Sequence, residues 1–246
     1  MKIERLLHRR VGAALRRHRM IEEGDRILLA ISGGVDSSAM ARILAEKRRN
    51  LPVRFELVGC VVETDLFGYA PGGSRWLNRY FEDLGIPLIR RRAAVLARMA
   101  PDRKLSCFFC AMQRRKALVD VALEERCSKI AYGHHMDDII ETLLLNMFYN
   151  AEISTMPARL ELDDHDLVLI RPMCLAKEAE VKRYARRFEM IEAVERCPHG
   201  DRGRRAAIKK IIKDLAEVDG RVRDNISASL GRVKPGYLVE KSRNNA

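Results

Sequence analysis

The chain has 246 residues, of which 47% are hydrophobic and 33% are charged, and its formal net charge at pH 7 is +12. This length and apolar content are enough for one α/β domain with a sizeable core. No apolar run approaches the roughly 18 residues of a membrane-spanning helix, so we expect a cytoplasmic protein that does not enter a membrane.

The positive charge is concentrated in three parts of the sequence. Residues 1–20 contain seven Lys or Arg and one acid, residues 201–246 contain twelve and six, and the segment from Arg90 to Lys116 contains nine and one. Such segments attract a polyanion such as a nucleic-acid backbone, although solvated helix faces have the same composition. The candidate RNA-binding residues are Arg90, Arg91, Arg92, Arg114, Arg115, Arg204 and Arg205.

Hydrophobic periodicity predicts alternating strands and helices. Leu7, Val11 and Ala14 recur at helical spacing, which predicts an amphipathic first helix. In chain order we expect a helix at 3–20, a strand and loop at 26–38, a helix to about 49, a strand at 55–62, a loop at 69–73, a helix at 74–84, a strand at 86–89, a helix at 107–127, a strand at 129–132 and a helix to about 149. Residues 151–172 are expected to be irregular apart from a strand at 167–170, followed by helices at 176–189, 204–216 and 219–230.

This alternation predicts the fold class and the place of the ligand. Repeated strand, helix and strand units imply a doubly wound parallel sheet that binds its ligand at the carboxyl ends of the strands. We expect a basic amphipathic helix at 1–24, a nucleotide-binding domain at 25–200 and a basic helical extension at 201–246.

The segment from Leu28 to Ser38 reads LLAISGGVDSS, an apolar strand that runs into a glycine turn and a helix start. Gly33 and Gly34 allow the backbone to direct N–H groups toward an anion, and the helix N-terminus adds positive potential. The lysine of the Walker pattern is absent, so a kinase or GTPase is disfavoured. The pattern predicts a phosphate-binding loop; an ordinary glycine turn is the alternative.

A second group of polar residues follows the strand predicted at 129–132. Gly133, His134 and His135 lead into Asp137 and Asp138 at a predicted helix start. Carboxylates beside a nucleotide can hold Mg²⁺, and Asp36, Asp137 and Asp138 are the candidate ligands. The alternative is a pair of capping or core histidines followed by favourable first-turn acids.

The six cysteines favour thiol, metal or redox chemistry over disulfides. Cys107 and Cys110 form a Cys-x-x-Cys at a predicted helix N-terminus, where the helix dipole and neighbouring arginines favour thiolates. With Cys197 they supply three ligands, enough for an iron-sulfur cluster, whereas His199 would complete a zinc site. A buried or redox-active pair is the alternative for Cys107 and Cys110. The core cysteines are expected to be Cys60, Cys127 and Cys174.

The loop at 32–38, the Cys107–Cys110 motif, the segment 133–149 and the tail 225–235 together resemble the tRNA 2-thiocytidine biosynthesis proteins of the PP-loop pyrophosphatase superfamily. The resemblance implies the PP-loop (adenine nucleotide alpha hydrolase-like) sheet, ATP with Mg²⁺, and a [4Fe-4S] cluster on Cys107, Cys110 and Cys197. It also implies that sulfur replaces the C2 oxygen of a tRNA cytidine. The expected ATP-binding residues are Ala30, Ser32, Gly33, Gly34, Asp36, Ser37, Ser38, Val62, Gly133 and His134.

The sequence therefore predicts an ATP-dependent tRNA sulfurtransferase with Asp36, Asp137, Cys107 and Cys110 as catalytic residues. The expected partners are tRNA and a sulfur donor, either a cysteine desulfurase system or free sulfide, and a homodimer is left open. A ligase of the lysidine-synthetase type is one alternative, since Val35 replaces a lysine that better-known thiolating relatives carry. A non-catalytic, nucleotide-responsive RNA-binding module with structural zinc is the other.

Overall fold

Six strands form one sheet in the computed structural model, which describes residues 2–99, 105–195 and 203–238. The strand order is β3-β2-β1-β4-β6-β5, and neighbouring strands are parallel except for β5, which runs antiparallel to β6. The expected parallel, doubly wound sheet is confirmed. The strands are β1 (Asp25–Ile31), β2 (Phe55–Thr64), β3 (Leu88–Ala93), β4 (Lys129–Tyr132), β5 (Arg159–Leu162) and β6 (Leu167–Ile170).

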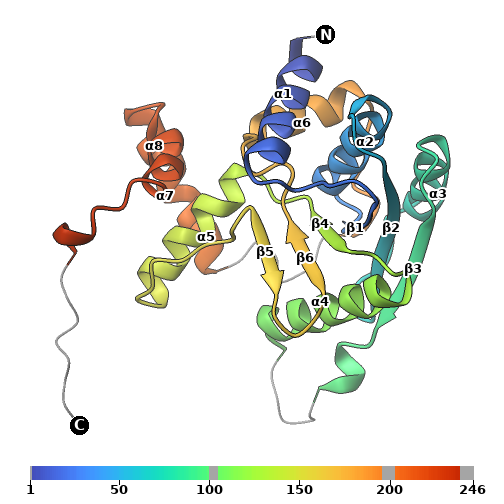
Figure 1. The fold of residues 1–246 in the computed structure, drawn as a ribbon. Coiled ribbons are helices and arrows are strands. Elements are labelled where there is room, and N and C mark those ends of the chain that lie inside the picture. The colour runs from blue at the N-terminus through green and yellow to red at the C-terminus, as the bar shows by residue number, and fades with distance from the viewer. Residues whose placement is uncertain (1, 100–104, 196–202, 239–246) are drawn as a thin grey trace.

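Helices cover both faces of the sheet (Figure 1). Side chains alternate along β1, so that Ile27 and Leu29 join the core beneath one helical layer while Leu28 joins the core on the other face. The first layer contains α1 (Lys2–Arg17), α2 (Val35–Asn50), α3 (Gly73–Asp83) and α6 (Glu178–Arg187), and the second is α4 (Cys107–Glu124).

The remaining long helices lie beside the sheet. In Figure 1, α7 (Arg204–Val218) and α8 (Val222–Ser229) lie next to α5 (Met136–Tyr149) and away from the central strands. A small apolar cluster of Ile140, Ile208 and Ile212 joins α5 to α7. Two short 3₁₀ turns complete the described elements, Leu96–Arg98 and Pro235–Tyr237. No helix in the described ranges is long and apolar enough to cross a membrane.

The structure corrects the sequence prediction at the sheet edge. Residues 151–166 were expected to lack a strand, but Arg159–Leu162 forms β5 and pairs with β6 across a short polar turn. The alternating pattern of Arg159, Leu160, Glu161 and Leu162 suits an exposed edge strand, which needs little apolar content. In addition, β3 extends to Ala93 and so includes Arg90, Arg91 and Arg92.

The strand order creates a crevice at the carboxyl ends of β1 and β4, because the chain connections after these two strands lead to opposite sides of the sheet. The chain moves from β1 outward through β2 to β3, then returns to place β4 on the other side of β1. The loop after β1 and the loop after β4 therefore meet at the carboxyl edge of the sheet, which is where ligands bind in such folds.

Candidate functional site

Gly33 and Gly34 make the turn between β1 and α2. Gly33 has a φ of +82°, and a Cβ added there would lie 2.6 Å from Cγ1 of Val194, so both the backbone and the space favour glycine. Gly34 is the N-cap of α2, with extended backbone angles. The first turn of α2 thus begins at the crevice, an arrangement that binds anions.

Serine hydroxyls brace this loop from within. The backbone N–H of Ser32 donates to Oγ of Ser37 at 3.2 Å, and the two hydroxyl oxygens are 3.1 Å apart. The hydroxyls of Ser37 and Ser38 both donate to the carbonyl of Gly34, at 2.9 and 3.2 Å. Ser38 is fully buried, so it supports the turn from below and does not line the crevice.

Gly133 lets the loop after β4 approach the phosphate-binding loop closely. A Cβ at this position would meet backbone atoms of the helix start, 3.0 Å from Cα of Ser37 and 3.2 Å from the carbonyl carbon of Asp36. These contacts are tighter than ordinary van der Waals distances, and backbone atoms move less easily than a side chain. The absent side chain therefore sets the spacing between the two loops.

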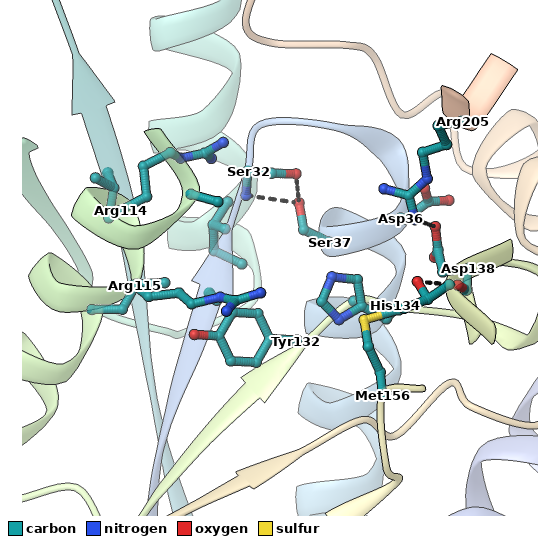
Figure 2. Close-up of a pocket in the computed structure, with 17 residues that line it drawn as sticks. Ser32, Asp36, Ser37, Arg114, Arg115, Tyr132, His134, Asp138, Met156 and Arg205 are labelled. Carbon is teal, nitrogen blue, oxygen red and sulfur yellow. Dashed lines mark hydrogen bonds and ion pairs between the residues drawn. The ribbon is translucent and has the colours of Figure 1, made fainter. Parts of the chain in front are cut away.

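The two loops border a pocket of about 520 Å³ (Figure 2). Many of the residues predicted from the sequence meet there, although they come from six helices and strands and from two loops. Gly33 and Gly34 shape the turn without lining the pocket, and Asp137 points elsewhere. The predicted residues that line it are Ala30, Ser32, Asp36, Ser37, Val62, Gly133, His134, Asp138, Arg114, Arg115 and Arg205.

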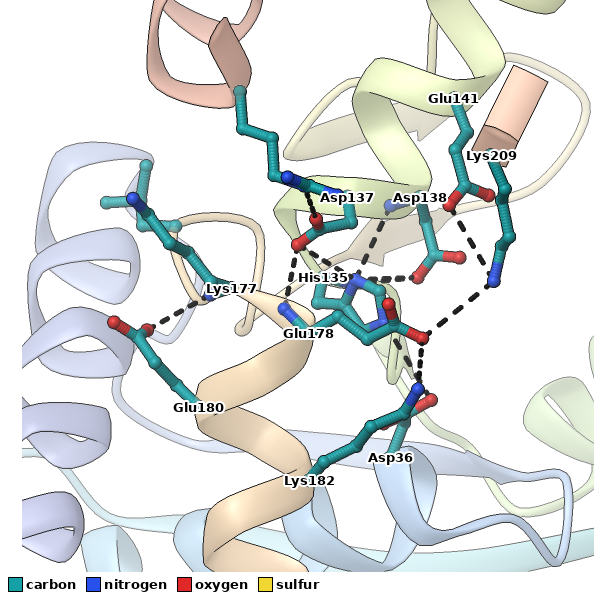
Figure 3. A network of polar contacts seen from close by, with 12 residues as sticks. Asp36, His135, Asp137, Asp138, Glu141, Lys177, Glu178, Glu180, Lys182 and Lys209 are labelled. Atoms are coloured by element: carbon teal, nitrogen blue, oxygen red, sulfur yellow. Dashed lines mark hydrogen bonds and ion pairs between the residues drawn. The ribbon is translucent and has the colours of Figure 1, made fainter. Parts of the chain in front are cut away.

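The three predicted metal-binding carboxylates differ in their contacts (Figure 3). Asp137 is buried, and its two oxygens accept the N–H of Glu178 at 2.7 Å and Nε of Arg223 at 3.0 Å. Asp138 lines the pocket and accepts the N–H of His135 at 3.0 Å. Asp36 also lines the pocket, and its Oδ1 is buried with no hydrogen-bond partner among the described residues.

The environment of Asp36 favours its neutral form. Burial raises the pKa of its carboxyl, and the nearby carboxylates of Asp138, Glu178 and Glu192 raise it further, although His135 acts in the opposite direction. A cation bound here would relieve this repulsion. Asp36 and Asp138 therefore have the character of a divalent-cation site, whereas Asp137 has both oxygens occupied.

The two histidines have separate surroundings. His135 is buried as the N-cap of α5 and forms a capping box with Asp138. His134 lines the pocket, where its ring stacks on Tyr132 with 5.5 Å between centroids. Burial lowers the pKa of His134 to about 4, and Arg171 and Arg205 lower it while Asp138 opposes them. His134 is therefore neutral at physiological pH.

The cysteine pair begins α4, a helix that lines the pocket from Ala111 onward. Ser106 caps the helix by accepting the N–H of Phe109 at 3.1 Å. Cys107 is exposed and Cys110 is half-buried one turn later, next to Ala111, which lines the pocket. Cys197 lies outside the described residues. Within the described ranges no group of three metal-ligating side chains occurs, so the pair alone is placed by the structure.

Several predicted RNA-binding arginines have acidic partners. Arg90 pairs with Glu63 at 2.9 Å, and Arg91 pairs with Glu124. Arg205 lines the pocket while its Nε donates to Glu141 at 3.0 Å. Arg92 and Arg114 line a smaller adjoining hollow of about 200 Å³, and the guanidinium of Arg204 lies over the ring of Tyr149.

Sequence reasoning missed several further residues at the site. Tyr132, Thr142 and Met156 line the pocket, and Arg171 lies behind His134 with its Nε donating to the ring. Tyr132 ends β4 one residue before Gly133, so its place at the strand terminus was a usable signal. Met156 and Arg171 belong to the segment predicted to be irregular, which hid their proximity.

Comparisons with known proteins agree with this geometry. A PP-loop domain model matches residues 4–213. The tRNA-cytidine(32) 2-sulfurtransferase of Anaeromyxobacter sp. (strain Fw109-5) is 33% identical over 98% of this chain and 80% of that protein. The enzyme of the same name from Alkalilimnicola ehrlichii is 35% identical over 97% of this chain and 76% of that protein.

Solved structures support the fold. The U34-tRNA thiolase NcsA from Methanococcus maripaludis, solved with its [4Fe-4S] cluster, superimposes with a TM-score of 0.80 at 22% identity, over 99% of this chain and 84% of that one. The NH3-dependent NAD synthetase from Campylobacter jejuni gives a TM-score of 0.52 at 14% identity, over 96% and 90%. The resemblance found in the sequence is confirmed: the chain belongs to the PP-loop family and, within it, to the tRNA-cytidine(32) 2-sulfurtransferases.

Proposed function

We propose that this protein is an ATP-dependent tRNA sulfurtransferase that replaces the C2 oxygen of cytidine 32 with sulfur. One observation carries the proposal: the phosphate-binding loop and α4, the helix that begins with the Cys107–Cys110 pair, line the same pocket, in a member of the 2-sulfurtransferase family. Adenylation requires the loop, and the thiols supply sulfur chemistry that a ligase of the lysidine type does not need.

ATP would bind with its phosphates at the turn of Gly33 and Gly34. The first N–H groups of α2 are the donors available there, since the hydroxyl of Ser37 already donates to the carbonyl of Gly34. Asp36 and Asp138 fit Mg²⁺, which commonly takes one or two carboxylates together with phosphate oxygens. When bound, Mg²⁺ would offset the charge of the departing pyrophosphate. We assign Asp137 an anchoring role instead, because both its oxygens have protein donors.

The first step activates the base. The C2 oxygen of cytidine attacks the α-phosphorus of ATP, a new P–O bond forms, and the bond to pyrophosphate breaks. Arg114 and Arg115 reach the pocket from α4, and Arg205 reaches it from α7, so three guanidinium groups can compensate the negative charge of the phosphates. The target base must leave its stack to enter, which a tRNA loop permits at low cost.

The second step exchanges oxygen for sulfur. Hydrosulfide attacks C2 of the adenylated base, the C2–O bond breaks, AMP leaves, and one proton is released as the thiocarbonyl forms. The sulfur donor is sulfide, free or delivered by a cysteine desulfurase system. We place the reaction in the cytoplasm, where cysteine thiols such as Cys107 stay reduced.

The thiols of Cys107 and Cys110 fit an iron-sulfur cluster. They lie one helical turn apart at the start of α4, Cys107 is exposed, and the positive end of the helix favours thiolates. Cys197 is our candidate for the third ligand. When bound, a [4Fe-4S] cluster with three thiolate ligands would have one iron available to handle sulfide.

Anaerobic thiolation of unmodified tRNA tests the proposal. The reconstituted protein is incubated with tRNA, ATP, Mg²⁺ and sulfide, and the nucleosides are analysed by mass spectrometry. We expect an ATP-dependent 2-thiocytidine peak. The absence of any thionucleoside, in a preparation with a verified cluster, would contradict the proposal and favour a ligase.

A cysteine exchange localises the sulfur chemistry. Cys107→Ser should abolish thiolation while it leaves binding of an ATP analogue intact. Cys127→Ala is the matched control, because burial raises the pKa of the Cys127 thiol to about 11 and removes it from thiolate chemistry. Full activity of Cys107→Ser under anaerobic conditions would contradict the role assigned to the pair.

A further inference from the structure

Arg171 is a buried cation in the wall behind the pocket. It is 6% exposed, and no carboxylate within the described ranges pairs with it. Burying a guanidinium without an anion is costly, because the lost hydration is only partly replaced by neutral acceptors. The contacts of the guanidinium indicate why it is buried there without a carboxylate.

Those contacts are with His134, the carbonyl of Pro157 and the ring of Tyr132. Nε of Arg171 donates to Nδ1 of His134 at 3.3 Å, and another N–H donates to the carbonyl of Pro157. The guanidinium also lies 5.9 Å from the ring centroid of Tyr132. Tyr132 and His134 stack nearly parallel, with an interplanar angle of 7°. The imidazole is thus held by a hydrogen bond at one nitrogen and by stacking on its face.

The hydrogen bond determines which nitrogen carries the proton. Arginine has donors only, so Nδ1 of His134 must accept and cannot carry a hydrogen. A neutral imidazole then has its hydrogen on Nε2. No described residue hydrogen-bonds Nε2, and the ring lies in the pocket that Ser37 and Gly133 also line (Figure 2).

We infer that Arg171 is a positioning residue that fixes His134 as the Nε2–H tautomer, so that the ring donates a hydrogen bond to a phosphate oxygen of ATP. The inference deepens the proposed function and rests on it for the identity of the ligand. His134 then acts as a neutral donor beside the phosphate-binding loop, and it does not take a proton from the base. A donor such as arginine at Nδ1 selects the Nε2–H tautomer, whereas a carboxylate at Nδ1 would accept a hydrogen bond and select the Nδ1–H tautomer.

Nitrogen NMR on the full chain without ligands tests the tautomer. With ¹⁵N-labelled histidine, the His134 signals are assigned from their absence in His134→Gln. We expect Nδ1 at the shift of an unprotonated ring nitrogen and Nε2 at that of a protonated one. Arg171→Met should move both signals toward the averaged values of a mixed tautomer. A protonated Nδ1 in the wild-type protein would overturn the inference.

The matched control for Arg171→Met is Arg75→Met, which removes an exposed arginine on α3 and should leave the His134 signals unchanged. If Arg171→Met fails to fold, Arg171→Lys and the wild-type spectrum still decide the tautomer. His134 signals that remain identical in a folded Arg171→Met protein would show that Arg171 does not select the tautomer.

Nucleotide binding without RNA tests the donor role. The probe is α,β-methylene-ATP with Mg²⁺, measured by isothermal titration. Glutamine places an amide N–H near the position of Nε2, whereas asparagine places one near Nδ1. We expect His134→Gln to bind within a few-fold of the wild type. His134→Asn should bind about tenfold to a hundredfold more weakly, the range for a hydrogen bond to a charged acceptor. Arg171→Met should bind only about twofold to threefold more weakly than the wild type, because a mixed tautomer still populates the Nε2–H form.

The two measurements separate this inference from the proposed function. Wild-type affinity in His134→Asn would overturn the donor role even if tRNA is thiolated normally. Conversely, a protein that yields no 2-thiocytidine but has the Nε2–H tautomer and the expected order of affinities would retain the inference and lose the proposed function.

Discussion

Replacing Asp137 with asparagine separates an anchoring role from a metal-binding role. In the structure the carboxylate joins three helices, because it belongs to α5 and accepts donors from Glu178 on α6 and Arg223 on α8. Asparagine keeps one carbonyl oxygen, but its amide nitrogen would face a donor. At least one hydrogen bond to a buried charged group is therefore lost, and a donor is left unpaired.

The magnitude follows from that lost bond. A hydrogen bond involving a charged group contributes about 1.5 to 3 kcal/mol to the free energy of unfolding. For a protein of this size each kcal/mol shifts the melting temperature by about 2 to 4 °C, so we expect Asp137→Asn to melt about 3 to 12 °C lower. Arg223→Met should have a similar effect, and the double variant should lose less than the sum because both changes remove the same contact.

Thermal unfolding and Mg²⁺ dependence are measured on the same proteins. Asp137→Asn should lower the melting temperature without changing the Mg²⁺ concentration needed to bind an ATP analogue. Asp36→Asn and Asp138→Asn should raise that concentration, because they remove the carboxylates that line the pocket. An Asp137→Asn protein with the wild-type melting temperature and a raised Mg²⁺ requirement would refute this reasoning.

Three further predictions concern spacing, buried charge and pH. Gly133→Ala should lose about 1 to 3 kcal/mol of unfolding free energy and most ATP-analogue binding, because its Cβ would press on the backbone of Ser37. Urea unfolding measures the free energy, and isothermal titration measures the binding. Lys129→Met should cost about 3 kcal/mol in urea unfolding, because it leaves the buried carboxylate of Asp25 without its cation, now 2.6 Å away. As the pH falls from about 6.5 toward the pKa of His134 at about 4, the unfolded chain binds a proton that the folded chain excludes. Stability should therefore decrease by up to roughly 3 kcal/mol, and urea unfolding at several pH values should show a smaller decrease in His134→Gln.

Each of these changes has a control elsewhere in the chain. Gly220→Ala adds a Cβ with no atom within 4 Å, Lys210→Met removes a lysine whose side chain is 79% exposed, and His165→Gln changes an exposed histidine. The first prediction would be contradicted by a Gly133→Ala protein that binds the ATP analogue normally. The second would be contradicted by a Lys129→Met protein as stable as Lys210→Met. The third would be contradicted if stability fell equally with pH in the wild type and in His134→Gln.

The parts of the fold that the sequence predicted correctly have strong local signals. The apolar run of β1, the glycine turn and α2 are encoded within a short segment, and the same holds for β4, Gly133 and α5. Parallel strand pairing then brings the two segments together without further information. The edge strand β5 was missed because its four residues carry only a weak alternation, and its stability comes from pairing with β6.

The site was harder to predict where the side chains of adjacent residues point in different directions. Asp137 and Asp138 are adjacent acids in the first turn of α5, yet one faces α6 and α8 while the other lines the pocket. Helical geometry turns successive side chains by about 100°, so only one of the two can face a given side. A sequence contains the two acids but not the direction of the helix axis relative to the crevice.

The basic C-terminal region illustrates the same limit for charge. Counting Lys and Arg predicted a surface that binds RNA. Part of this positive charge is instead paired with acids beside the pocket. The pairs are Arg205 with the buried Glu141, Lys209 with Glu178 at 3.8 Å, and Arg223 with the buried Asp137. The two buried acids, Glu141 and Asp137, would be poorly tolerated without a nearby cation. The helices α7 and α8 therefore help to hold the starts of α5 and α6 in place. RNA would be attracted by the arginines that have no acid partner among the described residues, such as Arg114 and Arg115 at the pocket itself.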